Sequence, residues 1–187
     1  MADELIDILD DQGNRTGEAR WKSEAHALGL WHLSVQVWIY NSKGEVLLQK
    51  RAMSKEFFPG IWDLSATGHV AVSEDTFLSA VREIKEEVGL LVKEEDLEFF
   101  EIYKFAQNIR ENLKNYEFAH VYFLRFDGDM GELKFQEEEI DEIRFISLET
   151  FKKDLLGENT KKMYVPHYDF FLKVISVLQD KIFSVNF

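Results

Sequence analysis

Apolar and polar residues alternate along several segments of the chain, and this period of two is typical of β-strands. In the run 33–40, four apolar residues fall on one face: Leu33, Val35, Val37 and Ile39. The turn residues 41–44 separate this run from a second apolar run at 45–49, which predicts a β-hairpin. We expect an earlier hairpin with its turn at 10–17 and further strands at 97–105, 117–126 and 142–147.

The segment between Ser73 and Gly89 has the apolar spacing of a helix. Its apolar residues form one stripe at intervals of four, three and four, namely Phe77, Val81, Ile84 and Val88. We expect Ser73 to cap this helix, with Glu74 and Asp75 in the first turn, and Gly89 to follow the last turn in the left-handed conformation. A mixed sheet with helices is therefore predicted.

The length of 187 residues is typical of one domain, and no repeat or Pro/Gly/Ser-rich linker marks an internal boundary. We expect a single domain over residues 1–187, in which 1–29 form an N-terminal β extension and 30–150 form the core. A C-terminal helix is expected over 166–182, where apolar residues again recur at helical spacing.

The composition excludes several classes of function. With 45% hydrophobic and 30% charged residues the chain is a folded globule, and its net charge of −13 argues against binding to nucleic acid or anionic membranes. The absence of cysteine rules out disulfides and thiol chemistry. The N-terminus is acidic and no apolar run approaches the length of a membrane span, so we expect a cytoplasmic protein.

The polar face of the 73–89 helix concentrates negative charge. Glu83, Glu86 and Glu87 lie at helical spacing beside Arg82. Two such carboxylates about 5 Å apart repel by roughly 3 kcal/mol at an effective dielectric constant near 20. A solvated acidic face is one interpretation, as for most charge runs, and a cation-binding face is the other.

The residues around these acids distinguish the two interpretations. Gly68 is followed after five residues by Glu74, and after seven more by the run Arg82-Glu83-Ile84-Lys85-Glu86-Glu87-Val88-Gly89-Leu90. This pattern resembles the Nudix box, G-x5-E-x7-R-E-U-x-E-E-x-G-U with U apolar, at every defined position. The resemblance implies an α/β/α sandwich around a mixed sheet, and it favours a homodimer.

The chemistry of the box explains the acidic face. Mg²⁺ prefers oxygen ligands and is commonly held by carboxylates together with substrate phosphate, and it lowers the pKa of a bound water. The resemblance implies that Glu83, Glu86 and Glu87 bind Mg²⁺, or Mn²⁺ in its place, together with a backbone carbonyl of Gly68. It also implies that Arg82 orients a catalytic glutamate, and it makes Glu74 a further candidate.

Beyond the box, residues 4–124 are similar to the branch of Nudix proteins related to isopentenyl diphosphate isomerase. In the isomerase, the residues that match His26, His32, His69 and Glu117 help to bind a metal, and those that match Arg51 and Lys55 contact the substrate diphosphate. The spacing between His26 and His32 is one residue shorter than in bacterial isomerases, which leaves their ligation open. His69 shapes the loop or contacts the metal.

Two departures argue against isomerisation. The isomerase needs a thiol immediately before the Gly-His pair, where this chain has Thr67, and a threonine hydroxyl cannot replace a thiol as a general acid at neutral pH. One of the isomerase's paired glutamates corresponds to Asn115. We therefore predict Mg²⁺-dependent hydrolysis of a nucleoside diphosphate linked to a group X. The alternatives are an isomerase-like enzyme and a module that binds nucleotide diphosphates without turnover.

The remaining residues have both structural and functional interpretations. Arg51 and Lys55 are candidates for diphosphate contact, with a surface ion pair as the alternative. Glu117 or a box glutamate is the expected general base, whereas the run 137–139 is expected to be a solvated turn. The substrate is a small diphosphate, and the sequence leaves its base, sugar and X group open.

Overall fold

The computed structural model describes residues 3–183, which form two compact units. The first unit contains the described residues up to Val37, Thr67–Lys85 and Leu91–Phe123. The second contains Trp38–Ala66, Glu86–Leu90 and the described residues from Leu124 onward. Four elements contribute residues to both units: β3 (Trp31–Tyr40), β6 (Ala66–His69), α2 (Thr76–Val88) and β8 (Leu113–Arg125).

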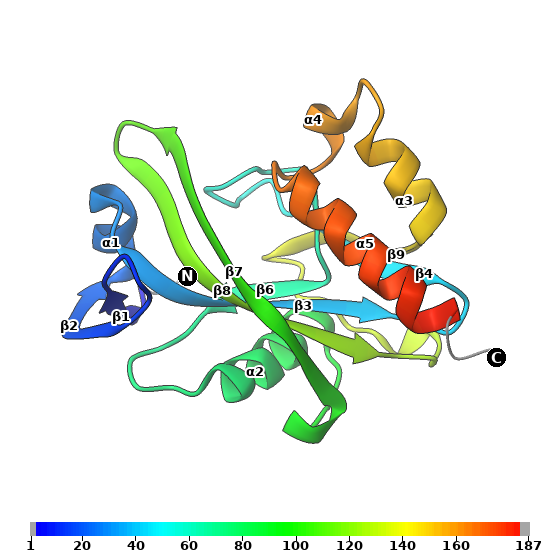
Figure 1. Cartoon of the computed structure of the whole chain (residues 1–187), viewed down its shortest axis with the longest axis horizontal. Coiled ribbons are helices and arrows are strands. Elements are labelled where there is room, and N and C mark those ends of the chain that lie inside the picture. Colours follow the sequence, from blue (N-terminus) through cyan, green and yellow to red (C-terminus); the bar gives the residue numbers. More distant parts are fainter. Residues whose placement is uncertain (1–2, 184–187) are drawn as a thin grey trace. The chain divides into compact units, whose positions relative to one another are not determined.

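The first unit combines a hairpin, a short helix and a longer hairpin. Besides its parts of β3, β6, α2 and β8, its elements are β1 (Leu5–Leu9), β2 (Arg15–Trp21), α1 (Lys22–Leu28), the 3-10 helix η1 (Glu94–Asp96) and β7 (Leu97–Arg110). Strand β1 pairs antiparallel with β2 and with β3, and β8 pairs with β3 and β7. Figure 1 shows β7 and β8 as a long hairpin. Both expected hairpin strands of the N-terminal segment are thus present.

In the second unit the strand β4 is central. The elements that lie wholly in this unit are β4 (Glu45–Arg51), β5 (Trp62–Asp63), the 3-10 helix η2 (Met130–Glu132), β9 (Ile140–Ser147), α3 (Leu148–Leu155), α4 (Thr160–Met163) and α5 (Tyr168–Phe183). Strand β4 pairs antiparallel with β9 along its length and with β5 at its end. Gln49 lies opposite Asp63 on β5 and opposite Ile143 on β9.

Aromatic side chains join the helices of the second unit to its sheet. Trp38 is fully buried, and its ring meets the ring of Phe171 on α5 edge-on at a centroid distance of 4.9 Å. Phe151 on α3 also packs against Trp38 and Phe171. The predicted terminal helix therefore covers the sheet of its own unit, as expected from its apolar spacing.

Helix α2 begins later than the sequence suggested. Its first residue is Thr76, and the side chain of Asp75 accepts a hydrogen bond from the N–H of Phe77 at 2.8 Å. Ser73 lies in the preceding loop with a φ of 61°, so the prediction that Ser73 caps the helix is wrong. The predicted C-terminal end is confirmed, because Gly89 adopts a φ of 75° directly after the last helical residue.

The remaining predictions of secondary structure are confirmed with shifted ends. The strands expected at 97–105 and 117–126 extend as β7 and β8, and the helix expected over 166–182 is α5. Helices α1, α3 and α4 were not predicted. Among residues 3–183, no helix is long and apolar enough to cross a membrane. The expected single domain, with an N-terminal β extension over 1–29, a core over 30–150 and a C-terminal helix over 166–182, stays a prediction.

Candidate active site and histidine cluster

Gly68 and Glu83 are in close contact within the first unit. Gly68 lies on β6 and Glu83 on α2, and a Cβ atom added at Gly68 would overlap all three atoms of the Glu83 carboxyl group. Only glycine therefore leaves room for the carboxylate, which is buried with 9% of the residue exposed. The contact thus places a carboxylate, a type of ligand that hard cations prefer, directly against the main chain of β6.

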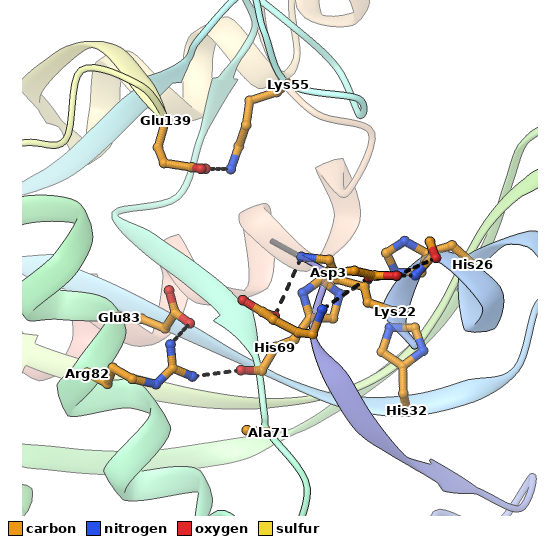
Figure 2. A network of polar contacts seen from close by, with 12 residues as sticks. Asp3, Lys22, His26, His32, Lys55, His69, Ala71, Arg82, Glu83 and Glu139 are labelled. Carbon is orange, nitrogen blue, oxygen red and sulfur yellow. Dashed lines mark hydrogen bonds and ion pairs between the residues drawn. The ribbon is translucent and has the colours of Figure 1, made fainter. Parts of the chain in front are cut away.

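Arg82 holds the Glu83 carboxylate in place. Its Nη1 donates to Oε1 of Glu83 at 2.6 Å, and its Nη2 donates to the carbonyl of His69 at 3.0 Å (Figure 2). Its guanidinium also donates to both carboxylate oxygens of Glu74. Burial opposes the charge of Arg82, but the hydrogen bonds and charges of Glu74 and Glu83 raise the pKa of the guanidinium above its ordinary value.

Glu74 ties the loop before α2 to the helix. One of its carboxylate oxygens accepts from the hydroxyl of Ser79 at 2.6 Å and from the N–H of Ala71 at 3.3 Å. Burial acts to raise the pKa of Glu74, but the hydrogen bonds from Arg82 and Ser79 outweigh it and lower that pKa. The structure therefore places Glu74 as an ionised anchor of Arg82.

The other two box glutamates lie on the last turn of α2, in the second unit. Glu86 is exposed, whereas Glu87 is buried with 5% of the residue exposed. Oε2 of Glu87 accepts a hydrogen bond from Nε2 of Gln49 at 2.9 Å. Because α2 is one continuous helix, Glu83, Glu86 and Glu87 share the side of the helix that their spacing predicted.

Arg51 and Lys55 both form ion pairs within the second unit. Nη1 of Arg51 donates to Asp63 at 2.9 Å, and its Nε donates to the carbonyl of Phe57 at 2.8 Å. Lys55 pairs with Glu139, as Figure 2 shows. Glu139 is 6% exposed, so the expectation that the whole run 137–139 is a solvated turn is wrong at this residue.

Three histidines of the first unit meet in one cluster. His26 lies on α1, His32 on β3 and His69 on β6, and each offers a ring nitrogen within 4.8 Å of the others. Nε2 of His69 lies 3.3 Å from Nε2 of His26. Glu117 on β8 places Oε1 3.9 Å from Nε2 of both His32 and His69, and its Oε2 accepts a hydrogen bond from Ser34 at 2.5 Å.

The protonation states of the cluster suit metal ligation. Burial lowers the pKa of His26 to about 3, and burial also lowers the pKa of His32 although Glu117 opposes this shift. Nδ1 of His32 lies 2.9 Å from the carbonyl of Leu30, so it carries the proton, and the buried Nε2 presents a lone pair that has no hydrogen-bond partner among residues 3–183. Neutral imidazoles with a carboxylate fit a divalent transition metal.

Several residues of these sites were not singled out from the sequence. Gln49 and Ser34 lie within predicted strand runs, at 45–49 and 33–40, and no pattern in the sequence points to Asp63. Their roles depend on partners 38, 83 and 12 positions away in the chain. No local pattern carries such pairings. At Asn115, where the sequence departs from the isomerase, the buried side-chain Oδ1 has no hydrogen-bond partner among residues 3–183.

Comparisons with known proteins agree with this geometry. The family model described as "NUDIX domain" matches residues 30–168. The chain is 32% identical over 173 residues to "Nudix hydrolase 3" of Arabidopsis thaliana, covering 89% of this chain and 22% of that protein. It is also 32% identical to "Uncharacterized Nudix hydrolase lmo0368" of Listeria monocytogenes, covering 87% of this chain and 88% of the relative.

The related branch and the fold are also represented. The chain is 32% identical to the isopentenyl-diphosphate Delta-isomerase of Serratia proteamaculans, over 67% of this chain and 68% of that enzyme. The crystal structure of DR0079 from Deinococcus radiodurans has a TM-score of 0.68 at 19% identity and covers 91% of this chain and 98% of its own. The predicted fold, a mixed sheet between helices, is thereby confirmed. The chain belongs to the Nudix family.

Proposed function

We propose that this protein is a Mg²⁺-dependent hydrolase that cleaves the phosphoanhydride bond of a nucleoside diphosphate linked to a group X. The class of activity follows from family membership, whereas the metal and the substrate are the proposal. The observation that carries it is the Glu83 carboxylate, which lies in the space left by Gly68 and is held by Arg82. A buried carboxylate held in one orientation is a better ligand for a cation than a carboxylate on a solvated surface.

The box residues would hold the metal. Glu83, Glu86, Glu87 and a carbonyl of Gly68 supply oxygen ligands, which Mg²⁺ and Mn²⁺ prefer. When bound, the metal would neutralise the diphosphate and lower the pKa of the water that attacks phosphorus.

The chain's other residues complete the proposed site. Arg82 fixes the orientation of Glu83 by its hydrogen bond at 2.6 Å. Glu117 or a box glutamate would accept the proton of the attacking water. Arg51 and Lys55 would contact the diphosphate, and to do so each must exchange part of its ion pair with Asp63 or Glu139 for phosphate oxygen.

A phosphate-release assay tests the proposal. The full chain is incubated with a panel of nucleoside di- and triphosphates, ADP-ribose-like compounds and small diphosphates. A coupled phosphatase releases inorganic phosphate from the products, and this phosphate is measured. We expect turnover that requires added Mg²⁺ or Mn²⁺ and is lost in Glu86→Gln and Glu87→Gln. Turnover that persists in chelator, or in both variants, would contradict the assignment. Stabilisation by ligand and metal in a thermal-shift panel without any product would favour the binding module.

The histidine cluster supports a second candidate, an isomerase-like enzyme. His26, His32, His69 and Glu117 converge in the first unit as the resemblance to the isomerase implied. Thr67 at the position of the thiol argues against proton transfer to carbon. Incubation of the protein with isopentenyl diphosphate separates the two functions, and we expect no dimethylallyl product.

We further propose a cytoplasmic homodimer that binds no nucleic acid and no membrane.

A further inference from the structure

Gln49 is a buried polar residue that the proposed reaction has not yet used. It lies on β4 and is 2% exposed. Its side-chain amide points to the last turn of α2, where Nε2 donates to Oε2 of Glu87 at 2.9 Å. A buried amide without partners would cost about 1 to 3 kcal/mol, and this hydrogen bond avoids that cost.

The backbone around Glu87 is fixed independently of Gln49. The carbonyl of Glu87 accepts from the N–H of Gln136 at 3.3 Å, and the carbonyl of Val88 accepts from the N–H of Lys134 at 3.0 Å. The end of the helix is therefore held by main-chain bonds. Gln49 acts on the side chain alone, because it restricts the rotamers that the Glu87 carboxylate can adopt.

The side chain that donates to Glu87 is uncharged. The amide donor carries no charge, so its hydrogen bond orients the carboxylate without adding a positive charge beside it. Arg51 lies two residues further along β4, and its Nη1 donates to Asp63, which stands directly opposite Gln49 in the sheet. The guanidinium of Arg51 thus pairs with Asp63, whereas the amide of Gln49 donates to Glu87.

We propose that Gln49 is a positioning residue that fixes the Glu87 carboxylate for metal binding. The inference rests on the proposed function, in which Glu87 is a metal ligand. Hydrogen bonds to a ligating carboxylate orient it, and their removal commonly lowers metal affinity about 10- to 100-fold. Gln49 supplies such a bond from a neutral donor.

The test measures Mn²⁺ binding to the full chain by titration calorimetry, without substrate. Glu87→Gln first defines the component of binding that depends on Glu87. Gln49→Met keeps the length of the side chain and removes the donor, and we expect it to weaken this component about tenfold or more. Gln36→Met is the matched control, since Gln36 is 4% exposed on β3 and its Oε1 has no hydrogen-bond partner in the part of the chain that the structure describes.

A second readout separates positioning from general destabilisation. With a hydrolysed substrate, Gln49→Met should raise the Mg²⁺ concentration needed for half-maximal rate and leave kcat at saturating Mg²⁺ close to that of the wild type. If Gln49→Met does not fold, Gln49→Asn keeps an amide that is one methylene too short and should weaken the same component.

The outcomes distinguish the two levels of the argument. If the wild type binds Mn²⁺ and Gln49→Met, or Gln49→Asn in its place, binds it equally well, the role of Gln49 is refuted while the hydrolase proposal stands. Equal losses in the Gln49 variant and Gln36→Met would refute it as well. If Glu87→Gln changes no binding, Glu87 is not a ligand and the metal site of the proposed function itself fails.

Discussion

The contact between Gly68 and Glu83 gives the sharpest test of the site. In Gly68→Ala the new Cβ overlaps the carboxyl group of Glu83, whereas real Cβ atoms keep about 3.0 Å from other heavy atoms. The carboxyl group must therefore move by about 1 Å to restore even that separation. It is the far end of a flexible side chain, so the fold can accept the movement, but the hydrogen bond from Arg82 at 2.6 Å cannot survive it unchanged.

This geometry predicts a large loss of function with a small loss of stability. A misplacement of about 1 Å at a catalytic group can cost about 100-fold in rate, which corresponds to about 2.7 kcal/mol. Loss of the partly buried Arg82–Glu83 bond should lower the free energy of unfolding by only about 1 kcal/mol. Metal-dependent turnover and urea unfolding of the same variant measure the two quantities.

Gly131→Ala is the control, because its Cβ would lie 3.2 Å from the nearest atom, in the side chain of Asp129. It should leave turnover unchanged. Wild-type turnover in Gly68→Ala would refute the view that the position of Glu83 matters. A loss of stability large enough to unfold the protein would show that Gly68 serves the fold instead.

Three further predictions concern stability. His26 has a pKa of about 3 in the folded protein and 6.5 when unfolded, so below pH 6.5 the unfolded state takes up a proton that the folded state does not. Urea unfolding in chelator should therefore show a free energy of unfolding about 2 kcal/mol lower at pH 5 because of this residue, and His26→Gln should remove that loss. Gly89→Ala forces a left-handed φ on alanine and brings its Cβ to 2.8 Å from the carbonyl of Lys134, and thermal unfolding should show a loss of about 2 kcal/mol, with no loss refuting the strain. Tyr122→Phe removes the hydrogen bond to the hydroxyl of Thr76 at 2.7 Å and should lower the free energy of urea unfolding by about 1 kcal/mol, and an unchanged value would contradict a contribution of this bond.

The local patterns of the sequence predicted most elements of the fold. Strands and helices depend on the spacing of apolar residues, which is visible in any short window, and Gly89 marks the end of α2 by a backbone requirement of its own. The predicted start of α2 is misplaced because Ser73 and Asp75 are both residue types that commonly cap helices. The choice falls on Asp75, and the loop geometry that decides it is set by residues outside the window: Ser73 donates its N–H to Asp7 at 2.9 Å.

The candidate site was predictable where the box specifies it and not elsewhere. The spacing of the box fixed which acids share a side of α2, but it did not show that Glu87 is buried while Glu86 is exposed. Nor could it separate Glu139 from its two acidic neighbours, because burial there depends on the pairing with Lys55 across 84 positions. Contacts of this range follow from topology, which a linear pattern does not encode.

The partners of the buried glutamates also explain how an acidic chain can tolerate them. In the first unit, Glu83 is offset by a cation, since Arg82 donates to it directly while a second carboxylate, Glu74, shares the same guanidinium. In the second unit, Glu87 receives a neutral amide from Gln49. One arginine thus serves two acids and an amide serves the third, which leaves a net negative charge on the face of α2. In the proposed function, a divalent cation would neutralise part of this negative charge.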